Sequence, residues 1–178
     1  MLSIDDAVSS TEFSLSGVNY KREYLASHED DVLVISLTAD RKRSISFELS
    51  LNRPERAIVT IDNNIIYLEG QLNDGFEGNS GVRFKTKLEI INTGGDLKNN
   101  DNSIHISNAD EALILISTST NMLDDNFETS VSELHENAQK HSFKELKLSH
   151  ITAYKQKFDR VKLNLGDQDN ITPTDKRL

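Results

Sequence analysis

Apolar residues alternate with polar ones through much of the first two thirds of the chain, and this period of two constrains the fold more than any other feature. The clearest stretch is residues 44–51, SISFELSL, in which Ile45, Phe47 and Leu49 share one side. The pattern recurs over residues 82–90, VRFKTKLEI. Because neighbouring side chains of a strand point to opposite faces, each stretch predicts a strand with one buried and one wet face.

Further short stretches are also typical of strands joined without intervening helices. In residues 82–90, the inward side chains are Val82, Phe84, Leu88 and Ile90, and the water-facing ones are Arg83, Lys85, Lys87 and Glu89. The other predicted strands are Leu2–Ala7, Val18–Ser27, Val32–Thr38, Ala57–Ile61, Ile65–Gly70, Ser103–Ser107 and Ala112–Thr118. Turns are predicted at Asp62-Asn63-Asn64 and Gly94-Gly95-Asp96, and loops at Leu72–Ser80 and Lys98–Asn102. Short connections of this kind predict an antiparallel sheet.

The period changes to that of a helix after Asn121. A helical stripe is formed by Phe143, Leu146, His150, Tyr154 and Phe158. Capping boxes are predicted at Ser130 with Glu133 and at Ser142 with Glu145. We therefore expect two helices, over residues 131–140 and 143–159. Alternation returns over Arg160–Leu165, and the polar tail 167–178 follows.

Composition excludes several classes of function. The net charge of −9 repels nucleic-acid phosphates and anionic lipid headgroups, so we expect neither nucleic acid nor a membrane surface as a partner. The absence of cysteine removes disulfides, thiolate metal sites and thiol nucleophiles. No window is apolar enough for a membrane span, and residues 1–10 lack the order of a signal peptide. The length suits roughly one domain.

Candidate catalytic and binding residues are few. Sugar-cleaving enzymes need two carboxyl groups, and Glu48, Glu69, Glu89 and Glu111 fall on predicted strands or at their ends. Surface charge is the favoured interpretation of each. His150 lies on the helical stripe, where a hydrogen-bonded core or interface histidine is favoured over a ligand, and no metal site is predicted.

Exposed aromatic rings can form a platform for sugars, but this chain has no tryptophan. Tyr20 and Tyr24 share one side of a predicted strand and are the candidate substrate-binding residues. Packing against a neighbouring sheet or domain is the favoured alternative for both.

Five ordered segments resemble one family of enzymes. They are Gly17–Ser27 (GVNYKREYLAS), Val32–Asp40 with Ser44–Arg56 (SISFELSLNRPER), Asn108–Ala112 with Thr120-Asn121, His150–Tyr154 with Phe158–Val161, and Pro173–Leu178 (PTDKRL). Together they cover almost the whole chain and resemble the amino-terminal region of glycoside hydrolase family 95, the α-L-fucosidases.

This resemblance implies an amino-terminal β-sandwich, a helical linker, an (α/α)6 catalytic barrel and a carboxy-terminal β domain. It implies inverting hydrolysis of terminal α-L-fucosyl linkages, notably α-1,2, with the acid and the base on the barrel. The barrel would begin after Leu178, so we assign no catalytic residue and no cofactor to this chain. An earlier segment of the family's sandwich is absent here, which leaves us expecting incomplete sheets with open edges.

We therefore predict an antiparallel β-sandwich portion over residues 1–121. Residues 122–178 would form a helical linker and a return strand leading toward a catalytic domain. The expected role is a non-catalytic scaffold, with the barrel of the same polypeptide as partner, a fucosylated glycan as substrate of the whole enzyme, and export by resemblance. The alternatives are an independent carbohydrate-binding module, or the same domain of a related α-L-galactosidase or phosphorylase.

Overall fold

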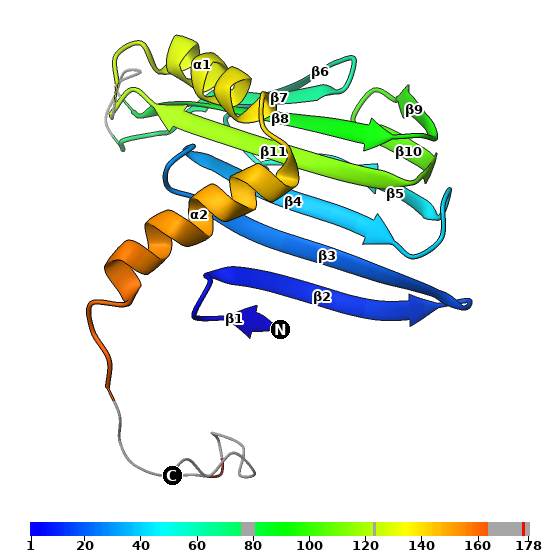
Figure 1. The fold of residues 1–178 in the computed structure, drawn as a ribbon. Coiled ribbons are helices and arrows are strands. Elements are labelled where there is room, and N and C mark those ends of the chain that lie inside the picture. The colour runs from blue at the N-terminus through cyan, green and yellow to red at the C-terminus, as the bar shows by residue number, and fades with distance from the viewer. Residues whose placement is uncertain (76–80, 123, 164–175, 177–178) are drawn as a thin grey trace.

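The computed structural model describes residues 1–75, 81–122, 124–163 and 176, and it consists of two antiparallel sheets and two helices (Figure 1). The strands are β1 (Leu2–Ser3), β2 (Val8–Leu15), β3 (Val18–Ser27), β4 (Val32–Ala39), β5 (Ile45–Leu49), β6 (Ala57–Asp62), β7 (Ile65–Gln71), β8 (Arg83–Thr93), β9 (Asp96–Asn99), β10 (Ile104–Ala109) and β11 (Glu111–Thr120). The helices are α1 (Phe127–Gln139) and α2 (Phe143–Phe158).

The two sheets differ greatly in width. The large sheet has the strand order β1-β2-β3-β4-β11-β8-β7-β6, and the small sheet has the order β5-β10-β9. Every ladder within them is antiparallel. The predicted antiparallel β-sandwich followed by two helices is therefore confirmed.

A layer packs on each face of the large sheet. Figure 1 shows α1 and α2 lying across the face that is turned away from the small sheet. The small sheet packs on the other face through a sandwich core whose buried members are Ile45, Ile66, Leu88, Ile90, Ile104, Ile106, Ala109, Ala112 and Ile114. A second core beneath the helices consists of Val8, Leu25, Val32, Val34, Leu115, Ala138 and Leu146. Burial of apolar surface in these two cores supplies the main stabilisation of the three layers.

The second helix is tied to the first strands by polar contacts. Lys147 Nζ lies 2.6 Å from Glu23 Oε1 on β3, and His150 Nε2 lies 3.0 Å from the carbonyl oxygen of Ala7. The Tyr154 hydroxyl donates to the carbonyl oxygen of Ile4 at 2.8 Å. His150 is buried, as expected of a hydrogen-bonded core histidine. These contacts fix where α2 crosses the sheet.

The two predicted helices are present, but only one start was predicted correctly. At α2, Ser142 and Glu145 form the expected capping box. The start of α1 was wrong, because the helix begins at Phe127 with Asn126 as its N-cap, and Ser130 lies inside it with its hydroxyl on Asp124. Buried contacts of Phe127 with the sheet extend the helix beyond the point that local capping signals indicate.

Two strands were missed. The expected strand Leu2–Ala7 is reduced to β1, and β2, VSSTEFSL, was not predicted because serine and threonine weaken its alternation. A tight turn with positive φ at Ser16 and Gly17 joins β2 to β3 and sets their pairing. The predicted loop Lys98–Asn102 is wrong in its first two residues, which belong to β9.

The end of the described chain also differs from expectation. Alternation over Arg160–Leu165 predicted a return strand, but residues 160–163 form no strand, and 164–165 lie outside the described residues. No other strand is present there to supply pairing partners for the backbone of residues 160–163, which explains the failure within the described part. Residues 76–80 of the predicted loop Leu72–Ser80 also lie outside the described residues.

The wet face assigned to residues 82–90 was wrong at two positions. Glu89 retains 4% of its exposure and Lys87 retains 8%. Alternation correctly placed both on the face opposite the sandwich core. That face is not open to water, however, because α1 packs over β8 and β11.

Candidate functional site

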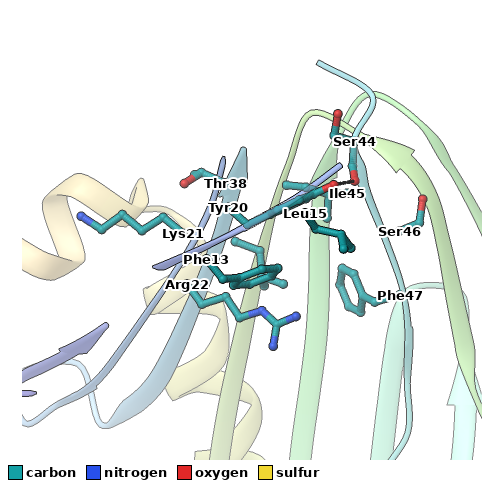
Figure 2. A pocket seen from close by; sticks show the side chains of 11 residues that line it. Phe13, Leu15, Tyr20, Lys21, Arg22, Thr38, Ser44, Ile45, Ser46 and Phe47 are labelled. Carbon is teal, nitrogen blue, oxygen red and sulfur yellow. Dashed lines mark hydrogen bonds between the residues drawn. The ribbon is translucent and has the colours of Figure 1, made fainter. Parts of the chain in front are cut away.

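A groove between the two sheets is the first candidate for a site. It has a volume of about 180 Å³ (Figure 2). It lies where the large sheet, at β2 and β3, continues sideways beyond β5, the edge strand of the small sheet. The lining residues are Phe13, Leu15, Tyr20, Lys21, Arg22, Leu37, Thr38, Ser44, Ile45, Ser46 and Phe47. Phe47, which the alternation placed inward, is partly buried and forms part of the wall. The groove exists because the large sheet is wider than the small one.

Aromatic rings and one guanidinium form the floor of the groove. Phe13 and Tyr20 are cross-strand neighbours, and their rings stack with centroids 5.0 Å apart. The Arg22 guanidinium carbon lies 5.2 Å from the centre of the Phe13 ring. The Tyr20 hydroxyl donates to the carbonyl oxygen of Ser44 at 3.2 Å, the dashed line in Figure 2. The polar end of Tyr20 thus bridges the two sheets.

Of the two tyrosines that the sequence singled out, the structure places only Tyr20 in the groove. Tyr24 lies on the same side of β3, opposite Ser9 and Ile35, and is partly buried without lining the groove. Two of the rings that line the groove, Phe13 and Tyr20, are stacked on each other, which leaves them less face for a sugar. A role of Tyr20 and Tyr24 in substrate binding stays a prediction.

A shallower hollow of about 540 Å³ adjoins the groove near the β2–β3 turn. Its polar groups satisfy one another: the Asn19 side-chain nitrogen donates to Asp40 Oδ2 at 2.6 Å, and the Asn19 backbone N–H donates to Asp40 Oδ1 at 3.0 Å. These backbone and side-chain hydrogen bonds lower the pKa of Asp40. The Asn19–Asp40 pair therefore ties the start of β3 to the end of β4.

The four strand glutamates do not converge on a common cleft. Glu48 lies 57% exposed on the small sheet, with His105 Nε2 at 3.3 Å. Glu69 lies 2.6 Å from Lys85 Nζ and is half exposed, and Glu111 is exposed at the start of β11. Glu89 is buried beneath α1. No two of these four form the facing pair that glycoside hydrolysis requires.

Glu89 instead anchors a buried polar network that joins α1 to the large sheet. Its Oε2 accepts a hydrogen bond from His135 Nε2 at 2.9 Å. Its Oε1 accepts from the side-chain nitrogens of Asn64, at 2.9 Å, and of Gln139, at 3.0 Å. The His135 Nδ1 lies 3.3 Å from the Ser117 hydroxyl. Because a carboxylate only accepts, the hydrogen bond to Glu89 requires a proton on Nε2, and the Ser117 hydroxyl, which can donate or accept, satisfies Nδ1.

The network holds Glu89 in its ionised form. Burial raises the pKa of Glu89, but the hydrogen bonds from His135 and Asn64 and the charges of His135 and Lys87 outweigh burial, so the pKa falls below the usual value. Folding and the ionisation of this carboxyl therefore favour each other.

Serine, histidine and glutamate in a row are also the parts of a nucleophilic triad, but this arrangement cannot serve as one. Ser117 and His135 have no exposed surface, so a substrate cannot reach the hydroxyl. The network is structural, and it stabilises the docking of α1.

Sequence reasoning missed this network, although one signal was available. Phe127, Val131, His135 and Ala138 recur at helical spacing and are the buried residues of α1. A buried histidine on such a stripe needs a polar partner. A strand that carries an acidic residue on the face opposite its apolar residues could supply that partner. Within the described residues, no cluster of three or more histidine or acidic side chains is placed to hold a metal ion. Neither helix of the described residues is suited to spanning a membrane.

These features define the class of protein: an antiparallel β-sandwich with a wide and a narrow sheet, continued by helices that pack on the wide sheet. A comparison with protein families gives the particular one. Residues 1–125 match the family described as "Glycosyl hydrolase family 65, N-terminal domain", and the chain belongs to it. The match includes every strand of the described residues.

Two individual proteins are also similar. "Alpha-L-fucosidase 2" of Arabidopsis thaliana is 25% identical over 206 residues, which cover 96% of this chain and 24% of that protein. The structure titled "Putative kojibiose phosphorylase from human microbiome" superimposes with a TM-score of 0.56 at 12% identity, over 86% of this chain and 24% of that one. At this identity, the second likeness shows the fold alone.

The chain therefore spans about a quarter of the length of each of these proteins. The resemblance to an α-L-fucosidase that the motifs indicated is confirmed, whereas membership of family 95 in particular stays a prediction.

Proposed function

We propose that this chain is the non-catalytic amino-terminal β-sandwich of an exported glycoside hydrolase, and that it supports the catalytic domain of the same polypeptide. One observation carries the proposal: the four strand glutamates lie apart, and the most buried of them is committed to holding α1. The family membership and the short span relative to both similar proteins support it.

The proposed division places the β-sandwich portion in residues 1–121 and the linker in residues 122–178. Both helices of the linker are held against the large sheet, α1 by the Glu89 network and α2 by the contacts of Lys147 and His150. A linker fixed in this way sets the direction in which the chain leaves the sandwich. The scaffold would thereby orient a catalytic (α/α)6 barrel and form one wall of its pocket.

The proposed reaction of the whole enzyme is inverting hydrolysis of terminal α-1,2-fucosyl linkages. Support comes from the ordered motifs and from the fucosidase that covers the same residues. The alternatives are an α-L-galactosidase or a phosphorylase with the same amino-terminal domain, and the similar phosphorylase structure keeps the second open.

Assays of two proteins test the proposal. With 2′-fucosyllactose, the 178-residue chain should release no fucose, and the longer protein that includes the next domain should release it with inverted configuration, as followed by NMR. Release by the short chain would contradict the scaffold role. Turnover that requires inorganic phosphate and yields a sugar phosphate would favour the phosphorylase.

A Glu48→Gln variant of the longer protein is a matched control, because Glu48 lies on the outer surface of the small sheet. Its turnover should equal that of the parent enzyme. A large loss would place catalytic chemistry on this domain.

A further inference from the structure

The edge of the small sheet at β5 is open. β5 pairs with β10, and no other strand in the described part of the chain pairs with it. In an antiparallel ladder, every second residue of an edge strand directs its N–H and C=O away from its partner. β5 therefore offers a row of main-chain donors and acceptors, and such an edge is a template for another strand.

The large sheet continues past this edge and presents an apolar floor. Phe13 and Leu15 on β2 are 37% and 62% exposed, and they lie on the same side as Tyr20. A strand added beside β5 would lie above this floor, as one sheet of a sandwich lies above the other. Alternate side chains of that strand would then point into the groove.

The charge of the groove selects among such strands. Arg22 is the charged side chain that points into the groove, in a protein whose net charge is −9. Lys21 also lines the groove, but its side chain is directed away from it in Figure 2, toward the other face of the large sheet. Lys21 pairs with Glu12 and Glu23, whereas Arg22 has no carboxylate partner among the described residues. Figure 2 shows the Arg22 guanidinium directed toward Phe47, into the groove. A free guanidinium over an aromatic ring recognises a carboxylate strongly.

We infer that β5 and the groove bind an extended polypeptide segment as an additional strand, one whose inward face carries a carboxylate between two apolar side chains. The carboxylate pairs with Arg22, and the apolar side chains pack on Phe13, Leu15 and Phe47. The volume of about 180 Å³ suits single side chains, since whole small-molecule ligands occupy about 300–1,000 Å³. Main-chain pairing supplies the affinity, and the groove supplies the selectivity.

A designed heptapeptide tests this inference independently of any glycosidase activity. The probe is the acetylated and amidated peptide TVTETVT, titrated into the ¹⁵N-labelled chain to about 2 mM, where weak strand addition is measurable. We expect saturable shifts of the amide signals of Ser46 and Glu48 on β5. The peptide TVPEPVT, which lacks two main-chain donors, should produce none.

Exchanging the charges provides the sharper control. Arg22→Gln should weaken binding of TVTETVT by about tenfold, because the charge-assisted pair is lost. Arg22→Glu should reject TVTETVT and accept TVTKTVT instead. Arg22 is exposed, so both variants should keep the unfolding midpoint of the parent.

Several outcomes would overturn the inference. They are the absence of shifts at β5, shifts confined to the other sheet edges, or equal binding by the Arg22→Gln variant. A concentration-dependent dimer in sedimentation that blocks the peptide would show that a second copy occupies the groove. Shifts of the same signals by 2′-fucosyllactose, with none by TVTETVT, would assign the groove to sugar.

Discussion

Removing the buried carboxylate of Glu89 should destabilise the chain far more than removing an exposed one. Glu89 retains 4% exposure and His135 retains none, and they form a 2.9 Å hydrogen bond. Removing one partner of a buried pair costs about 3–5 kcal/mol, because the other loses its compensation. In Glu89→Ala, Asn64 keeps its bond to the Ile90 carbonyl, and Gln139 can turn to water, since it lies at the exposed end of α1. The buried Nε2–H of His135 is then left without its partner, so we expect a loss of about 3 kcal/mol.

The matched control is Glu48→Ala, which removes the other strand glutamate that faces a histidine. The Glu48–His105 pair is 57% and 40% exposed, so water replaces the contact and the loss should stay below about 1 kcal/mol. Urea unfolding at neutral pH, followed by circular dichroism, measures both free energies. Equal losses in the two variants would refute the conclusion that the Glu89 network holds α1 on the sheet.

The same network predicts a pH dependence. Because the folded-state pKa of Glu89 lies below its usual value of 4.5, ionisation of Glu89 stabilises the fold. This contribution is fully present above about pH 4.5 and is lost as the pH falls through the lowered pKa. The stability difference between the parent and the isosteric Glu89→Gln variant should therefore shrink below pH 4.5. A difference that grows on acidification would contradict the direction of the shift.

Three further tests, which use five substitutions, probe the fold. Ile104→Ala, at a fully buried position, should cost about 2–5 kcal/mol in urea unfolding, and Phe47→Ala should cost less, because Phe47 lines an open groove; the reverse order would contradict the groove. Gly95→Ala should destabilise the chain more than Gly17→Ala, although both glycines have positive φ, because a Cβ at position 95 would lie 2.4 Å from the Ser107 carbonyl oxygen. Equal melting temperatures of the two variants would contradict this close contact. Ser142→Ala should cost about 1 kcal/mol by removing the cap of α2, and an unchanged stability would show that α2 docking does not depend on the cap.

Much of the strand pattern could be predicted because it is a local property. β3 was predicted at its observed bounds, and β4, β6 and β7 within one residue, because buried apolar residues and turn residues both mark their ends. The β6–β7 hairpin follows from Asn63, whose φ is +52°. β2 escaped prediction because its identity as a strand depends on pairing with β3, which lies elsewhere in the sequence.

The candidate site could be predicted only in fragments. Alternation placed Tyr20 and Tyr24 on one side of their strand, as observed, but no local rule shows that Phe13 stacks on Tyr20 or that the small sheet is too narrow to cover it. Likewise, alternation placed Glu89 on the correct face of its strand but could not predict which element covers that face.

The sequence by itself determined which residues share a face, where α2 begins, and the family motifs, since periodicity, caps and motifs are all readable over a few residues. Only the tertiary structure decided which faces are wet. Burial depends on the layer that packs against a face, and that layer comes from distant parts of the chain: α1 over Glu89, and the narrow small sheet beside Phe13. A covering layer makes Glu89 a buried anchor for α1, and the lack of one leaves the Arg22 guanidinium exposed in the groove.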